Sequence, residues 1–338
     1  ARPWHEYLSR CFYLLRQGEF VGDVLYFVGE EAPLRSEGLR RDIILPSLSH
    51  GYDYAFCNTE ILGQLQWEDG RLMTKKGSSF RVLILPESPW MSIDVLTTVE
   101  KLVMSGAIVS GPRPDSPPGR IGDAGRKPFD ALVRRIWGQC DGKGVTSNRL
   151  GKGMLYWGVP LDKVLKQHGI EPDFSYTLDN SGDYGPTPYP GAGIEYIHRS
   201  TGADEIYFLS NQHDEEKTVT ARIRVSGRQP EVWFPDSGRI YQLPDAKREG
   251  RHTEVTLHFD PGEAYFVVFR APGRASATEL APWRQSSKLV KDLSEDWTVE
   301  FVTEKTTTTD MSKLISWTKL EEDTLRYHSG TATYRKTF

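Results

Sequence analysis

Two carboxylate residues in the segment GYDYAFCNTEIL, Asp53 and Glu60, have the types and spacing best suited to bond-breaking chemistry. They are seven residues apart, about two helical turns, and would share a face if a helix began early in this segment. Paired carboxyl groups can hydrolyse a glycosidic bond, because one protonates the leaving oxygen and the other activates water or attacks carbon. In a competing structural interpretation, Asp53 or Asn58 caps the helix and Glu60 stabilises its first turn. The spacing alone favours the structural interpretation.

The other familiar catalytic and metal-binding motifs are absent from the sequence. It contains no GxSxG elbow, Walker loop, GxGxxG after a strand or paired CxxC. His5 and Glu6 begin like HExxH, but Ser9 stands where the second histidine should be, which excludes that zinc site. His198, in IEYIHR, is predicted to be a structural histidine. The three cysteines are far apart and predict neither a disulfide framework nor a metal knuckle.

The composition limits the class of protein. A length of 338 residues suggests two to three domains. The net charge of -4 gives no basic surface for nucleic acid or for an anionic membrane, and no apolar run approaches the ~20 residues that cross a bilayer. Nine Trp and 15 Tyr are expected mostly in packed cores, although exposed aromatic faces can stack on sugars.

The first half of the chain alternates apolar runs with helical patterns. The run 82–85 is predicted as a buried strand, Ser92 as the cap of a helix over 93–105, and 107–110 as the next strand. Two strands joined by a helix form a βαβ unit, so this region is predicted to be α/β. Further predictions are helices at 57–65, 129–137 and 161–168, strands at 24–28 and 154–157, and loops at 29–50 and 112–127.

The pattern changes at Pro172. After a loop at 179–193, short alternating segments recur every 8–12 residues, which predicts a β-sandwich ending near Arg270. These segments are IEYIHR, EIYFLSN, VTARIRV, EVWF, RIYQL, TEVTLHF and AYFVVFR. A connector at 272–292 leads to a β-rich tail at 297–338, in which WTVEF, LISWT, LRYHSG and TATYRKTF are predicted strands.

The two ends of the sequence fall inside predicted elements. The chain opens on an amphipathic helix that Gly18 ends, and it closes on a strand-like segment. We therefore expect it to be a fragment of a longer polypeptide.

A series of sequence blocks resembles glycoside hydrolase family 106, the α-L-rhamnosidases. The blocks include GYDYAFCNTEIL, FRVLILPES, KLVMSGAIVSGPRPDSP, IYFLSNQ, PEVWFPDSG and SGTATYRKTF, in the family's order. PWHEYLSRCFYLLRQGEFVGDVLYF resembles the stretch that leaves the family's catalytic (β/α)₈-type barrel. The resemblance covers nearly the whole chain.

The resemblance implies an architecture of four parts. Residues 1–20 would be the last helix of a truncated barrel, and 21–172 a flavodoxin-like (glutamine-amidotransferase-like) parallel α/β domain. Residues 173–272 would be a β-sandwich and 273–338 an incomplete, jelly-roll-like one.

It also implies inverting hydrolysis of terminal α-L-rhamnose from plant-type polysaccharides, outside the cell or in the periplasm. Calcium would assist sugar binding, and no organic cofactor, nucleic acid or membrane is expected to take part. The catalytic partner would be the N-terminal barrel of the same polypeptide, so the chain alone is expected to be inactive.

The resemblance assigns three site residues in this chain. Glu60 is the candidate second carboxylate, acting as base, with Asp53 and Asn58 as candidate sugar or calcium contacts. The metal ligands are otherwise unknown. Ala55 departs from the family's GYDYD pattern and removes a carboxylate that could accept a hydrogen bond or bind a cation.

Two alternatives stay open. The chain could be a non-catalytic carbohydrate-binding or scaffold fragment. It could also be a flavodoxin-like ligand domain that binds an anionic group near Pro86 and Gly111, although no Gly-rich phosphate loop opens a helix.

Overall fold

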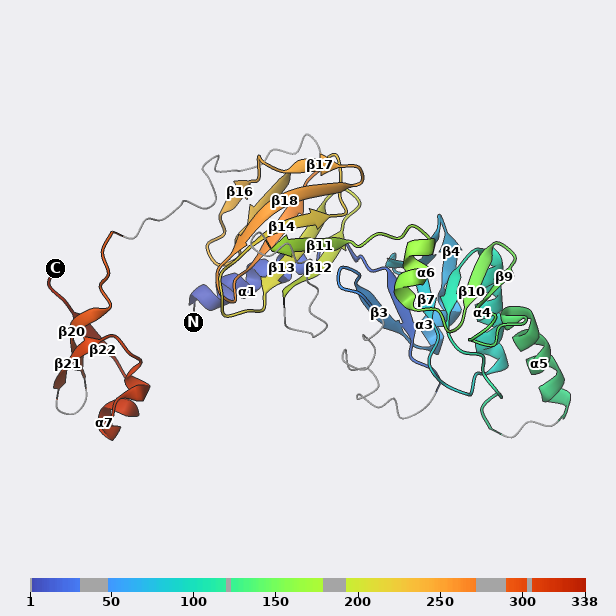
Figure 1. Ribbon diagram of the computed structural model, residues 1–338, viewed down its shortest axis with the longest axis horizontal. Helices are drawn as coiled ribbons and strands as arrows, with labels where there is room; N and C mark the ends of the chain where they lie inside the picture. Colours follow the sequence, from blue (N-terminus) through green and yellow to red (C-terminus); the bar gives the residue numbers. More distant parts are fainter. Residues whose placement is uncertain (1, 31–47, 120–122, 179–192, 272–289, 303–305) are drawn as a thin grey trace. The chain divides into compact units, whose positions relative to one another are not determined.

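The computed structural model describes residues 2–30, 48–119, 123–178, 193–271, 290–302 and 306–338 (Figure 1). The chain divides into two compact units, Ala1–Trp283 and Arg284–Phe338. The predicted loops at 29–50 and 179–193 and the connector at 272–292 lie mostly outside the described residues.

A parallel sheet forms the first half of the larger unit. Its strand order is β3-β2-β7-β8-β10-β9, in which only β9 runs antiparallel to its neighbour. Numbered along the chain, the five parallel strands follow the order 2-1-3-4-5, which is typical of doubly wound sheets. The strands are β2 (Val24–Phe27), β3 (Tyr54–Cys57), β7 (Val82–Ile84), β8 (Ile108–Ser110), β9 (Ser147–Leu150) and β10 (Gly153–Tyr156).

Helices cover both faces of this sheet, as expected for strands that are apolar throughout. On one face α4 (Ile93–Ser105) and α5 (Asp123–Trp137) pack with α3 (Thr59–Gln64) over Leu25, Leu83 and Val109. On the other, α6 (Leu161–Gln167) packs over Val24, Val82 and Ile108. The region is therefore α/β, as predicted.

Local signals fixed the limits of α4. The Ser92 Oγ accepts a hydrogen bond from the Val95 N–H at 3.2 Å, and Gly106 ends the helix with φ 131°. Both predictions are confirmed, because a side-chain cap and a residue without Cβ satisfy the end groups of a helix locally.

One prediction in this half was wrong, and one strand was not predicted. The segment preceding Asn58 forms strand β3, which pairs along its whole length with β2, so no helix begins early enough to put Asp53 and Glu60 on one face. Helix α5 begins at Asp123, inside the region predicted as loop up to 127. The sequence reading also missed a small antiparallel sheet of β4 (Gln66–Glu68), β5 (Arg71–Met73) and β6 (Ser79–Phe80).

The second half of the larger unit is a β-sandwich of two antiparallel sheets. All seven alternating segments are strands, as predicted, and their inward residues form one core. The six-stranded sheet is β1 (Glu19–Phe20), β12 (Ile194–Ser200), β13 (Glu205–Asn211), β19 (Ala264–Phe269), β15 (Pro230–Trp233) and β16 (Ile240–Gln242). The four-stranded sheet is β11 (Phe174–Leu178), β14 (Lys217–Ile223), β18 (His252–Phe259) and β17 (Lys247–Glu249).

The N-terminal helix α1 (Arg2–Leu15) packs on the outer face of the six-stranded sheet. Its buried Cys11 and Leu14 cluster with Ile206, Phe266 and Val268. Strand β1, which follows it, pairs with β12 of the same sheet. The helix is therefore part of the sandwich assembly in this chain.

The smaller unit contains a three-stranded antiparallel sheet of β21 (Thr307–Lys313), β20 (Glu295–Phe301) and β22 (Ala332–Arg335). LISWT and LRYHSG are not strands: their regions contain η3 (Trp317–Lys319) and α7 (Asp323–Arg326). Asp323 in the first turn of α7 favours a helix start over a strand, because it faces the positive end of the helix dipole.

Candidate functional site

Strand β3 separates the three predicted site residues. Asp53 lies directly before the strand, whereas Asn58 and Glu60 follow it. Because a strand advances about 3.3 Å per residue, Asp53 and Asn58 lie at opposite edges of the sheet. The structure brings Asn58 and Glu60 together at the carboxyl edge and places Asp53 at the amino edge. The helical face proposed for Asp53 and Glu60 does not exist.

Asn58 caps α3, as the structural interpretation predicted. Its Oδ1 accepts a hydrogen bond from the Ile61 N–H at 2.9 Å. Glu60 is exposed in the first turn of this short helix, next to the exposed Thr59. The Glu60 carboxylate is therefore presented to solvent at the edge where doubly wound sheets bind their ligands.

Asp53 belongs to a different environment. It is half-buried, and its Oδ1 accepts a hydrogen bond from the Tyr54 N–H at 2.8 Å. Its carbonyl oxygen accepts hydrogen bonds from the N–H groups of Asp23 and Val24, at 2.9 and 3.3 Å. Asp53 thus joins the starts of β2 and β3.

Glu30, which follows β2, occupies the N-terminus of α4. Its Oε2 accepts a hydrogen bond from the Ser92 N–H at 2.7 Å. A helix N-terminus is a favourable place for an anion, and here the chain supplies one of its own. This arrangement argues against an anionic ligand between Pro86 and Gly111. Trp90 lies close by on the loop after β7 and is 52% exposed.

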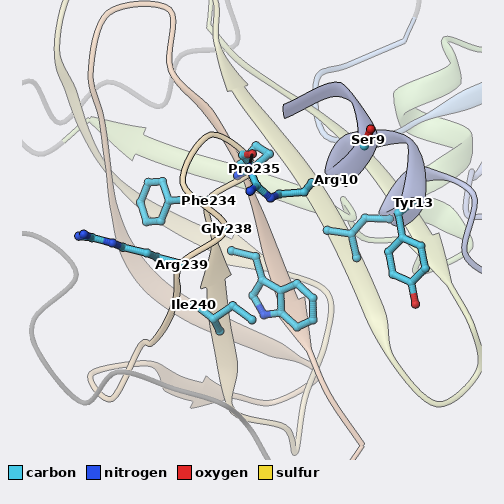
Figure 2. Close-up of a pocket in the computed structure, with 10 residues that line it drawn as sticks. Ser9, Arg10, Tyr13, Phe234, Pro235, Gly238, Arg239 and Ile240 are labelled. Carbon is cyan, nitrogen blue, oxygen red and sulfur yellow. Dashed lines mark hydrogen bonds between the residues drawn. The ribbon is translucent and has the colours of Figure 1, made fainter. Parts of the chain in front are cut away.

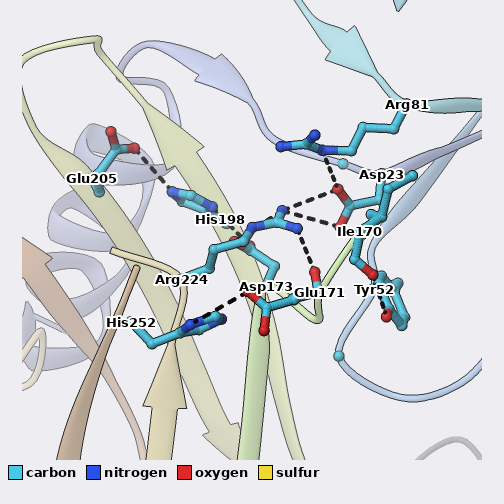
Figure 3. A network of polar contacts seen from close by, with 12 residues as sticks. Asp23, Tyr52, Arg81, Ile170, Glu171, Asp173, His198, Glu205, Arg224 and His252 are labelled. Carbon is cyan, nitrogen blue, oxygen red and sulfur yellow. Dashed lines mark hydrogen bonds and ion pairs between the residues drawn. The ribbon is translucent and has the colours of Figure 1, made fainter. Parts of the chain in front are cut away.

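A buried polar network lies at the amino edge, where the sheet meets the sandwich (Figure 3). Arg224, which follows β14, donates from Nη2 to both carboxylate oxygens of Asp23, at 3.0 and 3.1 Å. Arg81 Nε lies 3.3 Å from Asp23 Oδ1. The same Arg224 Nη2 is 3.3 Å from Asp173 Oδ1. One guanidinium group therefore joins the start of the parallel sheet, at Asp23, to the start of the sandwich, at Asp173.

His198 continues the network inside the sandwich. Its Nδ1 is 2.8 Å from Asp173 Oδ2 and its Nε2 is 3.0 Å from Glu205 Oε2. Its ring stacks on Tyr207 with the centroids 3.9 Å apart, and the Tyr207 hydroxyl donates to Asp173 Oδ1 at 3.0 Å. His198 is 4% exposed and paired at both nitrogens, which confirms the structural role predicted for it.

The charges of the network shift the pKa values of its members. Burial alone would lower the pKa of His198, but the carboxylates of Asp173 and Glu205 raise it to about 9. Burial alone would raise the pKa of Asp173, but His198 and Arg224 hold it below its ordinary value. At neutral pH the network therefore holds His198 as a cation and Asp173 as an anion.

The sequence reading missed this network apart from His198. A weak signal existed: Asp23 stands directly before the apolar run VLYF, and Asp173 stands between Pro172 and another strand. A single charge beside a buried strand needs a partner. The partner of Asp23 is Arg224, which lies more than a hundred residues away in the sequence. Sequence spacing therefore could not identify this pair.

An apolar cleft lies between α1 and the β15–β16 hairpin (Figure 2). It has a volume of about 340 Å³ and is lined mainly by apolar side chains, among them Leu14, Trp233 and Ile240. Arg10 crosses from α1 to the hairpin and donates from Nη1 to the carbonyl oxygens of Pro235 and Asp236, at 2.8 and 2.9 Å. Its lining residues include no carboxylate, so the cleft supplies no acid or base.

Within the residues that the structure describes, no three His, Cys, Asp or Glu side chains come together in a way that could hold a metal ion. Over the same residues, no helix is long and apolar enough to cross a membrane.

Comparison with known proteins identifies the family. A family model described as alpha-L-rhamnosidase (glycoside hydrolase family 106) matches residues 1–245. A rhamnosidase structure from Novosphingobium sp. PP1Y is similar over 99% of this chain and 30% of its own, with 31% identity and a TM-score of 0.77. A protein of Formosa agariphila named beta-glucuronidase is 31% identical over 272 residues, 80% of this chain. The chain spans 21% of that relative's length. The chain belongs to glycoside hydrolase family 106, the α-L-rhamnosidase family.

Proposed function

We propose that this chain is part of a glycoside hydrolase that removes terminal α-L-rhamnose from plant-type polysaccharides with inversion. The family match over residues 1–245 is the observation that carries the proposal. The 31% identity to a rhamnosidase over 99% of the chain supports the same substrate class.

In this proposal Glu60 acts as the base that activates water. Its exposure at the carboxyl edge of the sheet supports this role, because a catalytic carboxylate must reach both solvent and sugar. Asn58 lies two residues away, and the side-chain NH₂ group left over from its capping bond can donate to a sugar hydroxyl. Asp53 lies at the opposite edge, so its role in the proposal is to fix the start of β3.

The general acid of an inverting pair must lie about 6.5–9.5 Å from the base. Glu30, on the neighbouring strand end, already binds the N-terminus of α4. We therefore propose that the acid, and the calcium ligands of the enzyme, come from a barrel in the longer polypeptide that the relatives' lengths suggest.

Two further parts of the proposal concern fold and location. The 2-1-3-4-5 order of the parallel strands supports a flavodoxin-like assignment for residues 21–172. A polysaccharide substrate supports action outside the cell or in the periplasm, since such polymers do not cross membranes freely.

Replacement of Glu60 by Gln in the complete enzyme tests the proposal. The rate on a chromogenic α-L-rhamnoside should fall by about 10²-fold or more, because Gln cannot accept a proton from water. Glu68→Gln is the matched control, since Glu68 is also exposed but lies on the small sheet at β4. A rate for Glu60→Gln equal to that of the control would remove Glu60 from the mechanism.

A second substrate separates the activities suggested by the two relatives. The complete enzyme should hydrolyse an aryl α-L-rhamnoside much faster than an aryl β-glucuronide. The reverse preference would overturn the rhamnose assignment and leave the family membership intact.

A non-catalytic carbohydrate-binding or scaffold role is the second candidate. The exposed Trp4 and Trp90, 60% and 52% accessible, favour it because flat aromatic faces stack on sugars. If this alternative holds, the Glu60→Gln protein keeps both its polysaccharide binding and the rate of the unaltered enzyme.

A further inference from the structure

Trp90 lies at the carboxyl edge of the parallel sheet, the same edge as the candidate base. It belongs to the loop that leads from β7 to α4, whereas Glu60 belongs to the segment after β3. In doubly wound sheets, ligands bind outside the carboxyl ends of the strands, at the point where the strand order reverses. Here that point lies between β2 and β7, so the loop that contains Trp90 borders it.

The helices that follow β3 and β7 place Trp90 near Glu60. Helices α3 and α4 contact each other on one face of the sheet, and both begin at the carboxyl edge. Glu60 is in the first turn of α3, and Trp90 lies two residues before Ser92, the cap of α4. Because the axes of packed helices lie about 8–10 Å apart, we expect a separation of this order between the two residues.

The backbone on both sides of Trp90 is held by the loop that follows β8. The N–H groups of Asp115 and Ser116 donate to the Pro89 carbonyl oxygen, at 2.8 and 3.2 Å. The Met91 N–H donates to the Ser116 carbonyl oxygen at 3.1 Å, and Met91 itself is buried. Trp90 is therefore fixed between two anchored neighbours, which reduces the conformational entropy that a ligand contact would cost.

The Trp90 side chain stays open to solvent in spite of this anchoring. The residue is 52% exposed. Among the residues that the structure describes, none accepts a hydrogen bond from its indole N–H, and no aromatic or cationic group stacks on its ring. A flat apolar ring with a free N–H at its edge can stack on the C–H face of a pyranose and donate to one of its hydroxyl groups.

We propose that Trp90 binds the sugar unit on the leaving side of the bond that is cleaved, next to the terminal rhamnose. In an inverting mechanism the base acts on the face of the reacting sugar opposite to the leaving group. The leaving unit must therefore lie away from Glu60, across the reacting ring, which agrees with the separation expected for Trp90. The open side of the indole also suits a polymer that continues into solvent. The leaving-side assignment rests on the proposed function, whereas the stacking contact rests on the exposure and anchoring of Trp90.

Kinetics of the complete enzyme on two rhamnosides test the proposal. An oligosaccharide with a terminal α-L-rhamnose has a sugar on the leaving side, whereas α-L-rhamnosyl fluoride has none. Trp90→Ala should raise KM for the oligosaccharide about tenfold with little change in kcat, because it removes a contact made equally in the ground and transition states. Hydrolysis of the fluoride should change far less.

Two further variants sharpen the test. Trp90→Phe keeps an aromatic ring and should restore most of the affinity for the oligosaccharide. Phe12→Ala is the matched control, because Phe12 is an aromatic residue of similar exposure, 59%, on α1 of the sandwich. It should leave KM for both substrates unchanged.

Several outcomes would overturn the proposal. An unchanged KM of Trp90→Ala for the oligosaccharide would exclude the contact. An equal loss on the fluoride would show that Trp90 acts on the terminal sugar or on the fold, and an equal loss in Phe12→Ala would show that the effect is not local. If the unaltered enzyme cleaves neither rhamnoside, the proposed function fails and the leaving-side assignment fails with it. If it cleaves both and only the Trp90 prediction fails, the proposed function stands.

Discussion

The two edges of the parallel sheet differ in the burial and the pairing of their carboxylates. At the carboxyl edge, Glu60 is exposed, and its neighbour Asn58 caps the local helix α3. At the amino edge, Asp23 is fully buried and bonded to Arg224, 201 residues away in sequence. The first arrangement leaves a carboxylate available to a ligand, and the second uses its carboxylate to hold two layers together.

The comparison shows that a shifted pKa does not by itself mark a catalytic group. Asp173 and His198 both have shifted pKa values, but they lie with Asp23 and Arg224 in the buried network, to which a polysaccharide has no access. Shifted pKa values are frequent at catalytic sites, but buried ion pairs that join parts of a fold produce them too. Our proposal for Glu60 therefore rests on its exposure and on its position at the carboxyl edge.

The largest effect on stability is expected for Arg224→Met. This change leaves Asp23 and Asp173 buried without their shared cation, so the free energy of unfolding should fall by about 3–5 kcal/mol. Urea denaturation of the whole chain measures it. Arg222→Met is the control, because the Arg222 side chain is 39% exposed and its ion pairs, at 3.4 and 3.7 Å, should contribute less than about 1 kcal/mol. Similar losses in the two variants would refute the special role of the buried pair.

A pH-dependent effect of intermediate size is expected at His198. Its pKa is raised to about 9 in the folded state from about 6.5 when unfolded, so protonation stabilises the fold. This contribution is complete below pH 6.5 and is lost as the pH rises through about 9. The difference in unfolding free energy between the protein and His198→Gln should therefore shrink by a few kcal/mol from pH 6 to pH 9.5. His5→Gln, at an exposed histidine, serves as the control. A difference that stays constant with pH would contradict the prediction.

The smallest effect on stability is expected at the carboxyl edge. Asn58→Ala removes the cap of α3 and should lower the unfolding free energy by about 1 kcal/mol, whereas Asn58→Ser should preserve most of it. The same pair separates capping from sugar binding in the complete enzyme. If Asn58 only caps, Ser restores kcat/KM; if its amide also contacts sugar, Ser restores stability but leaves kcat/KM reduced.

Local signals predicted the elements that depend on nearby residues. The Ser92 cap, the Gly106 stop and the alternating strands of the sandwich were all predicted, because caps and strand periodicity act over a few positions. Strand β3 at residues 54–57 was not predicted, because its pairing with β2 rather than a local pattern defines it. The strand predicted for LRYHSG was wrong, because the short helix α7 from Asp323 to Arg326 includes the first two of these residues.

The sequence by itself determined the family and the α/β-then-sandwich order, because these depend on residue identity and on local periodicity. Only the tertiary structure decided that Asp53 and Glu60 lie at opposite edges of a sheet, and that Arg224 pairs with Asp23. Such contacts join segments far apart in the chain. These contacts form because folding buries whole faces of sheets and helices, and because a buried charge without a partner is unfavourable. The spacing of residues along a sequence shows neither effect.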